Sequence, residues 1–207
     1  MNSLWESFKQ EAEIFVSGQT LIETFDYSLN ISLKYNYLYV ETPKVACSSI
    51  KTILQKMELG NTDISWKNFE DIHNRDFSPL LKPSQIKPLN QYLEGNKLYK
   101  FCFSRNPYTR LLSCYSDKIQ TNRPEKRFIL QTLGKDPKKL DTYITFYEFV
   151  HAINQQKLIE MNPHWRTQYH QTYQENIKYD YIGKIENFTN DIKNILNKII
   201  QFIPQFI

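Results

Sequence analysis

Two strand-to-helix transitions constrain this chain of 207 residues more than any other feature. Residues 37–41 form a short aromatic and β-branched run that predicts a buried strand, and from Ser48 onward apolar residues recur at the spacing of one helix face. Residues 98–104 predict a second strand. Asn106 and Pro107 interrupt it, and a proline suits the first turn of the helix expected next. Both loops should lie beyond the carboxyl ends of parallel strands, where α/β proteins bind their ligands.

Later segments continue this alternation. Residues 143–154 predict a helix, residues 179–185 a third strand, and residues 188–200 an amphipathic helix. Strands that alternate with helices indicate an α/β fold in which helices flank a mostly parallel sheet.

The chain shows no repeat and no linker, so we expect one domain over residues 1–207, with a helical extension at residues 1–30. Two irregular stretches, residues 60–95 and 122–140, interrupt the alternation. Insertions of this length often form lids or binding segments, and we expect these two to build a substrate pocket.

Composition excludes several classes of protein. With 41% hydrophobic residues, 23% charged residues and a formal charge of +4, the chain is typical of a globular protein and too weakly basic to indicate a nucleic-acid partner. Its three cysteines have neither disulfide-framework nor zinc spacing. No apolar run is long enough for a membrane span, and the N-terminus lacks the pattern of a secretory signal, so we expect a soluble cytoplasmic protein.

The first loop carries groups suited to phosphate. It consists of Pro43, Lys44, Val45, Ala46, Cys47, Ser48 and Ser49. The free amides and dipole of a helix N-terminus favour an anion, Lys44 adds a full charge, and the two serines add hydroxyl donors. The glycine-rich lysine loop of nucleotide triphosphatases is absent, because Ala46 stands where a glycine is expected and the lysine precedes the turn.

The second loop adds a second candidate anion site. Arg105 stands at the end of the predicted strand and Ser113 two helical turns later, and an arginine can donate two parallel hydrogen bonds to one phosphate. Arg110, between them, either contributes to this site or caps surface charge.

These residues carry a resemblance to a known family. Residues 43–49 resemble the 5′-phosphosulfate-binding loop of the sulfotransferases, closest to the carbohydrate type (family 2), and Arg105 with Ser113 resembles the family's 3′-phosphate element. Residues 179–186, with Tyr181 and Gly183, are similar to a third segment of the same family. The resemblance implies a P-loop-like three-layer fold, 3′-phosphoadenosine-5′-phosphosulfate (PAPS) as sulfate donor without a metal, and cofactor-binding roles for all these residues.

Sulfuryl transfer requires a cation at the leaving phosphate and a base at the acceptor hydroxyl. Lys44 suits the first role. His73 is the first choice for the base because related enzymes commonly place a functional histidine in that region, and His164 is the second. Glu41 and Glu70 remain possible.

The sequence therefore predicts a PAPS-dependent sulfotransferase that acts on a hydroxyl of a carbohydrate or a related acceptor. A small ATP-dependent phosphotransferase and a non-catalytic nucleotide-binding module are the alternatives. The identity of the acceptor and the oligomeric state stay open.

Overall fold

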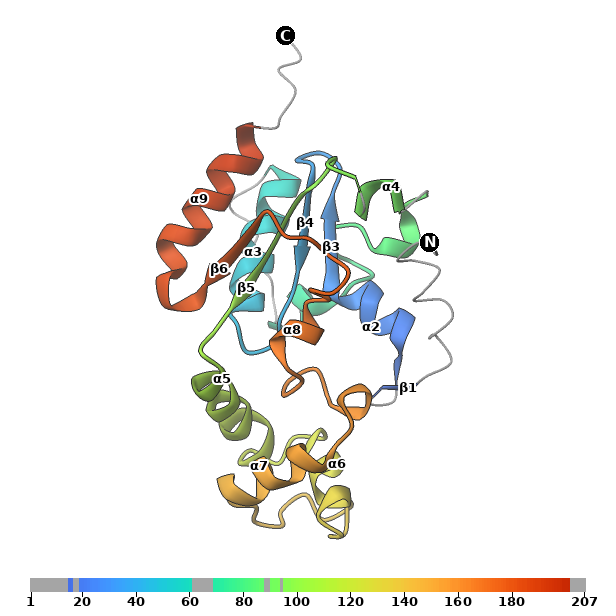
Figure 1. The fold of residues 1–207 in the computed structure, drawn as a ribbon, viewed down its shortest axis with the longest axis vertical. Coiled ribbons are helices and arrows are strands. Elements are labelled where there is room, and N and C mark those ends of the chain that lie inside the picture. The colour runs from blue at the N-terminus through green and yellow to red at the C-terminus, as the bar shows by residue number, and fades with distance from the viewer. Residues whose placement is uncertain (1–14, 17–18, 61–68, 88–89, 94, 202–207) are drawn as a thin grey trace.

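The computed structural model describes residues 15–16, 19–60, 69–87, 90–93 and 95–201 (Figure 1). A four-stranded sheet forms the centre of the fold, with the strands in the order β3, β4, β5, β6. These strands span Leu29–Ser32, Tyr37–Val40, Tyr99–Ser104 and Tyr181–Lys184. β4, β5 and β6 are parallel, and β3 pairs with β4 in the antiparallel direction. The carboxyl ends of the three parallel strands therefore meet at one edge of the sheet.

Alternating side chains divide the sheet into two apolar faces. Tyr37 and Tyr39 of β4 pack with Phe101 and Phe103 of β5 in the cluster that also holds buried residues of α3 (Cys47–Leu59) and α9 (Phe188–Gln201). Leu38, Val40 and Cys102 point to the other face, toward α2 (Leu21–Ser28) and α4 (Asn90–Leu93). The sheet is thus the middle of three layers.

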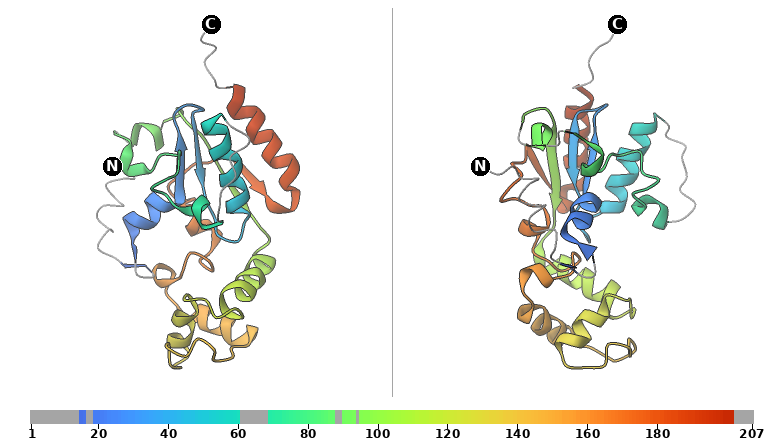
Figure 2. Two further views of the ribbon diagram at one scale, coloured as in Figure 1. Left: turned by 180° about the vertical axis from the view of Figure 1, so that it is seen from behind. Right: turned by 90° about the vertical axis from the view of Figure 1, so that its right-hand side faces the viewer.

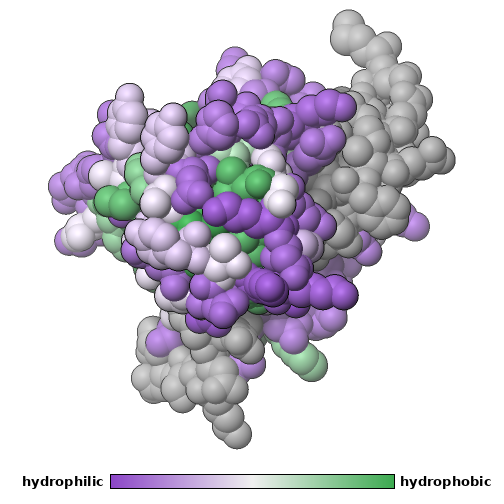
Figure 3. All heavy atoms as spheres, turned by 90° about the horizontal axis from the view of Figure 1, so that it is seen from below, coloured by the Kyte–Doolittle hydropathy of each residue, from purple (hydrophilic) through white to green (hydrophobic). Residues whose placement is uncertain are grey.

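A helical lobe lies beyond the carboxyl edge of the sheet (Figures 1 and 2). It consists of α5 (Pro107–Cys114), a π-helical turn η3 (Tyr115–Ile119), α6 (Lys126–Thr132) and α7 (Phe146–Gln155). The lobe has its own apolar core, which includes Cys114, Ile129, Phe149 and Trp165. Viewed from this end, the surface is mainly hydrophilic, with apolar residues in a smaller area near its centre (Figure 3).

The remaining elements are short. They are β1 (Phe15–Val16), β2 (Gln19–Thr20), the 3₁₀ turns η1 (Phe69–His73), η2 (Pro83–Gln85), η4 (Leu158–Glu160) and η5 (Ile185–Asn187), and the helix α8 (Gln168–Gln171).

The α/β fold and both strand-to-helix transitions are confirmed. The segment before residue 30 differs from the expected helical extension, because Leu29 and Asn30 already belong to β3. The stretch 122–140 contains α6, which buries Lys126, Ile129 and Leu130 within the helical lobe, and its role in a substrate pocket stays a prediction. β3 was not predicted, although Leu29, Asn30, Ile31 and Ser32 alternate between apolar and polar residues; all four are buried.

Replacing Gly183 with alanine should destabilise the sheet. An added Cβ would lie 2.5 Å from the Phe103 ring on the neighbouring strand, so the ring would have to move. We expect Gly183→Ala to lower the free energy of unfolding by about 1–3 kcal/mol in urea titration, the range for overpacked cores. The double variant Gly183→Ala with Phe103→Leu should lose less free energy of unfolding than the two single variants lose together. Unchanged stability together with weakened nucleotide binding would contradict this packing role.

Candidate functional site

The loop after β4 has the strained backbone of an anion-binding turn. Lys44 and Ala46 both have positive φ, 68° and 50°, in the left-handed region that non-glycine residues avoid. Ala46 precedes the first residue of α3, and no side chain caps that helix start. The first-turn amides of α3 are therefore left to a ligand, as the sequence predicts for this loop.

Two arginines from the second loop hold this shape. Arg105 donates from Nη1 to the Lys44 carbonyl at 3.1 Å, and Arg110 donates from Nε to the Pro43 carbonyl at 3.0 Å. Val45, which stands between Lys44 and Ala46, is fully buried and anchors the turn in the core. These contacts offset backbone strain of about 1–3 kcal/mol per residue.

Arg110 has neither of the roles that the sequence suggested. Its side chain is buried, and it donates to three backbone carbonyls, those of Pro43, Pro163 and Arg166. Burial lowers the pKa of this guanidinium to about 10, so it stays charged at neutral pH. Arg110 therefore ties the lysine loop to the segment that carries His164.

One cavity of about 530 Å³ joins the predicted elements, and we call it the donor cavity. Its predicted lining residues are Pro43, Lys44, Ala46, Cys47, Ser48, His73, Arg105, Ser113 and His164. The sequence gave no indication of Tyr27, Asp117 and Lys118, which also line it. Val45 and Ser49 do not line it, because Val45 is in the core and Ser49 faces solvent.

Tyr181 and Gly183 lie elsewhere. The Tyr181 hydroxyl donates to Asp191 at 3.1 Å, and Gly183 packs against the Phe103 ring. Their cofactor-binding roles stay predictions.

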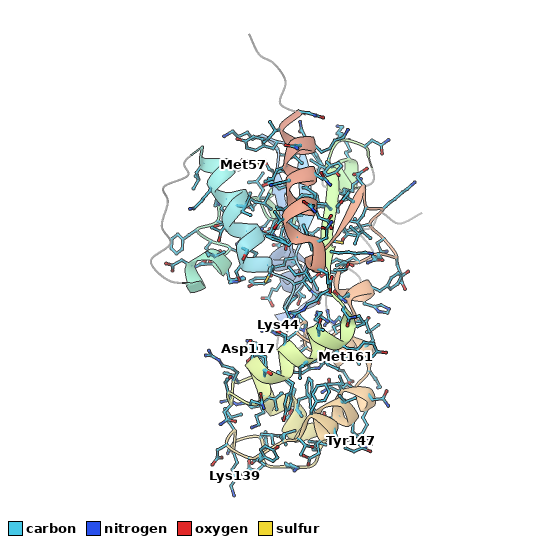
Figure 4. All side chains as sticks on the ribbon, turned by 90° about the vertical axis from the view of Figure 1, so that its left-hand side faces the viewer. Lys44, Met57, Asp117, Lys139, Tyr147 and Met161 are labelled. Carbon is cyan, nitrogen blue, oxygen red and sulfur yellow. The ribbon has the colours of Figure 1, made fainter. Side chains whose placement is uncertain are left out.

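Lys44 is paired with Asp117 across the junction of the sheet and the helical lobe (Figure 4). Its Nζ donates to Asp117 Oδ2 at 3.0 Å. Burial alone would raise the pKa of Asp117, but the hydrogen bond and charge of Lys44 hold that pKa below its usual value. Asp117 lies in the π-helical turn η3, an irregularity that is frequent at functional sites.

The two candidate histidines have different ring orientations. His73 Nε2 lies 2.8 Å from Ser48 Oγ, and its Nδ1 lies 3.3 Å from both Lys51 Nζ and Tyr27 OH. Lys51 also forms a buried ion pair with Glu41. An ammonium group can only donate, so His73 accepts at Nδ1 and carries its proton on Nε2, from which it donates to Ser48.

His164 has the opposite tautomer. Asn162 Oδ1 accepts from the His164 backbone N–H at 3.0 Å, which fixes the orientation of this amide, and it lies 2.7 Å from His164 Nδ1. Nδ1 therefore carries the proton, and the lone pair of the neutral ring is on Nε2. Burial lowers the pKa of each ring to about 4, so both rings are neutral at pH 7. The charges of Lys51 and Lys118 add to this effect at His73, and the charge of Lys118 adds to it at His164.

The other candidate groups are less available for proton transfer. Burial and the charge of Glu41 raise the pKa of the Cys47 thiol to about 11, which keeps it protonated. Burial raises the pKa of Glu41, although its ion pair with Lys51 opposes the shift. The Glu70 side chain lies outside the described residues.

A second cavity of about 350 Å³ adjoins the donor cavity, and five residues line both. The shared residues are Tyr27, Pro43, Cys47, His73 and His164. The residues that line only the second cavity are Thr24, Ser28, Glu41, Glu125, Asn162, Pro163 and Gln171. Of the two predicted insertions, the stretch 60–95 contributes His73 and the stretch 122–140 contributes Glu125.

A lysine loop, a helix N-terminus and an arginine–serine element at the carboxyl edge of a parallel sheet are typical of the nucleotide-phosphate sites of α/β proteins. The Sulfotransferase family model matches residues 27–202, and the chain belongs to this family.

Curated relatives carry carbohydrate sulfotransferase names. Carbohydrate sulfotransferase 14 is 31% identical to this chain in Mus musculus and 30% in Homo sapiens, each time over 176 residues, 80% of this chain and 45% of the relative. Carbohydrate sulfotransferase 11 of Danio rerio is 28% identical over 184 residues, 80% of this chain and 51% of the relative. The chain thus matches about half the length of these relatives. No solved structure gives a significant match. Among the described residues, no helix is long and apolar enough to cross a membrane.

The Lys44–Asp117 pair predicts a test of anion binding. Asp117→Asn removes the carboxylate that competes with a bound phosphate for Lys44, so the affinity for adenosine 3′,5′-bisphosphate (PAP) should rise about fivefold, which corresponds to the ~1 kcal/mol of a partly exposed ion pair. Isothermal titration calorimetry measures this change. Asp141→Asn, at an exposed site in the lobe, is the control and should bind as the parent does. Weaker PAP binding by Asp117→Asn would show that Asp117 orients Lys44 instead of competing with the ligand.

Proposed function

We propose that this protein transfers the sulfuryl group of PAPS to a hydroxyl of a carbohydrate and releases PAP. The observation that carries the proposal is the donor cavity, which brings Lys44 and the N-terminus of α3 together with Arg105 and Ser113. PAPS bears a phosphate at the 3′ position and a phosphosulfate at the 5′ position of its ribose, and two separate anion sites in one cavity suit it. The relatives' names support a carbohydrate as acceptor.

The residues of the lysine loop would act on the leaving group. Lys44 and the amides of Cys47, Ser48 and Ser49 would stabilise the charge that develops on the 5′-phosphate oxygen as its bond to sulfur breaks. His73 would donate from Nε2 to Ser48 Oγ, which turns the serine hydroxyl proton toward the phosphosulfate. Arg105 and Ser113 would hold the 3′-phosphate.

The tautomers favour His164 as the general base, although the sequence placed His73 first. The lone pair of His164 is on Nε2, and its Nδ1 proton is held by Asn162, an arrangement suited to a base. His164 would take the acceptor's hydroxyl proton as the acceptor oxygen bonds to sulfur, and the pair of electrons from the broken S–O bond would stay on the phosphate of PAP. His73 is less suited to the role of base, because its Nε2 already carries a proton and its Nδ1 lone pair accepts from Lys51.

The pH profile and two variants test this assignment. Because burial lowers the pKa of His164 to about 4, its base form is present at neutral pH and is lost as the pH falls toward that value. We expect kcat/KM to be level between roughly pH 6 and 8 and to fall below about pH 5. His164→Gln should lower kcat by about 10²–10⁴, the usual contribution of a general base.

His73→Gln is the matched control because a glutamine amide can still donate to Ser48. It should cost less than about tenfold in kcat. A larger loss in His73→Gln than in His164→Gln would return the role of base to His73.

Ligand binding separates this function from its alternatives. Saturating PAP at 100 times its Kd should stabilise the protein by about 2.7 kcal/mol and raise Tm in thermal-shift assays, without magnesium and with chelator present. Lys44→Ala should lower kcat by about 10²–10³, the scale for removal of one transition-state donor, and lower Tm by no more than about 2–4 °C, which corresponds to the lost ion pair with Asp117. Lys139→Ala, an exposed lysine at the far end of the lobe (Figure 4), is the control.

Each alternative makes a different prediction in the same assays. A magnesium-dependent shift with ATP and none with PAP would identify a phosphotransferase. Binding of PAP without turnover of PAPS would identify a nucleotide-binding module. Metal independence and a cytoplasmic location belong to the proposal.

A further inference from the structure

Lys118 lines the donor cavity beside Lys44, although the sequence gave no indication of it. It stands in the π-helical turn η3, and its side chain is 16% exposed. Its Nζ lies 3.7 Å from Asp117 Oδ2, the oxygen that accepts from Lys44 at 3.0 Å (Figure 4). Two ammonium groups thus converge on one anionic oxygen, an arrangement that also suits the oxygens of a bound oxyanion.

Lys118 also lies close to the two candidate bases. Beyond the effect of burial, its charge lowers the pKa of both His73 and His164, and all three side chains line the donor cavity. As in phosphoryl transfer, the attacking and leaving oxygens lie roughly in line, with the transferred group between them. The proposed mechanism places Lys44 at the leaving oxygen and His164 at the attacking one. A cation close to both of these residues would therefore lie beside the sulfuryl oxygens.

The carboxylates that pair with Lys118 leave it able to bind a ligand. Its Nζ lies 2.7 Å from Glu125 Oε1, and the side chains of Glu125 and Asp117 are 21% and 39% exposed. Ion pairs that water reaches contribute little net free energy, so a bound anion can join or replace them. An ammonium group has three donors, which leaves a donor for the ligand while both carboxylates stay in place.

We propose that Lys118 is a second catalytic cation of the donor cavity, which contacts the sulfuryl oxygens of PAPS while Lys44 contacts the leaving phosphate. This inference rests on the proposed sulfotransferase function and adds a residue to it. Lys118 would hold the sulfuryl group in line and keep its own protons throughout. The acceptor oxygen forms the new bond to sulfur and passes its proton to His164, and the electron pair of the broken S–O bond stays on the phosphate of PAP.

The affinities for PAPS and PAP test this contact without an acceptor. Above pH 7 the two ligands carry the same total charge, because the sulfuryl group adds one negative charge and removes one from the 5′-phosphate. A general loss of positive charge would therefore weaken both to a similar extent. We expect Lys118→Met, which keeps an unbranched side chain, to weaken PAPS binding about tenfold or more in isothermal titration calorimetry, the scale of one lost charge-assisted hydrogen bond. PAP binding should weaken less than about threefold, because a charge that does not touch the ligand is largely screened.

Two further variants separate a contact with the ligand from a structural ion pair. Glu125→Gln removes the carboxylate and keeps the lysine, so PAPS affinity should stay within about threefold of the parent's or rise. Lys135→Met is the matched control, because Lys135 pairs with Glu148 at 3.0 Å in the same lobe and lines neither cavity. It should leave both affinities unchanged.

The outcomes separate this inference from the function beneath it. A loss in Lys118→Met that is equal for PAPS and PAP, or no loss at all, would overturn the role of Lys118 and leave the sulfotransferase function in place. So would a matching loss of PAPS affinity in Glu125→Gln, because it would assign the effect to the ion pair. A parent protein that binds neither ligand would instead remove the proposed function, and the inference with it.

Lysine acetylation of the parent protein decides if Lys118→Met does not fold. Mass spectrometry measures the rate of acetylation at Lys118, with Lys135 as the internal reference. At saturation, PAPS should slow acetylation of Lys118 more than PAP does, because only PAPS brings the sulfuryl oxygens to its ammonium group. Equal protection by the two ligands would overturn the proposal.

Discussion

The interactions of Arg110 hold together the groups on which the site depends. A single buried guanidinium binds the carbonyl of Pro43 in the lysine loop and the carbonyls of Pro163 and Arg166 on both sides of His164. These segments are more than a hundred residues apart in sequence, and neither is regular secondary structure at its point of contact. The hydrogen bonds to three carbonyls satisfy a charge that would otherwise be costly to bury. The distance between Lys44 and His164 is therefore set by a side chain that does not itself line either cavity.

The same constraint explains how the loop functions without glycine. Two non-glycine residues with positive φ are unfavourable in an isolated peptide, and they persist here because Arg105, Arg110 and the buried Val45 fix the turn from outside. The lysine loop and the second loop are thus interdependent. Arg105 both contributes a charge to the donor cavity and shapes the turn that carries Lys44, so its removal should affect more than one contact with a bound nucleotide.

Much of the fold and the donor cavity could be predicted from the sequence, because they depend on local patterns. Periodicity identified β4, β5, α3 and α5, and parallel strands bring their following loops to one edge, which is why Lys44, Arg105 and Ser113 meet. The rest depends on contacts between distant residues. The pairing of β3, the ion pair of Lys44 with Asp117 and the burial of Arg110 have no local pattern. Gly183 was predicted to bind cofactor from a family-like segment; in the structure it packs against Phe103 of the neighbouring strand, and its cofactor role stays a prediction.

The order of the two candidate bases could not be obtained from sequence at all, since it depends on which ring nitrogen meets which partner. Both rings are neutral and both line the cavities, so burial and pKa do not distinguish them. What distinguishes them is that His73 Nδ1 faces an ammonium and His164 Nδ1 faces a carboxamide oxygen. An ammonium forces the ring to accept at Nδ1 and an amide oxygen forces it to donate there, which leaves a proton on one Nε2 and a lone pair on the other. The proposed choice of base therefore rests on Lys51 and Asn162, which hold the two rings in opposite tautomers.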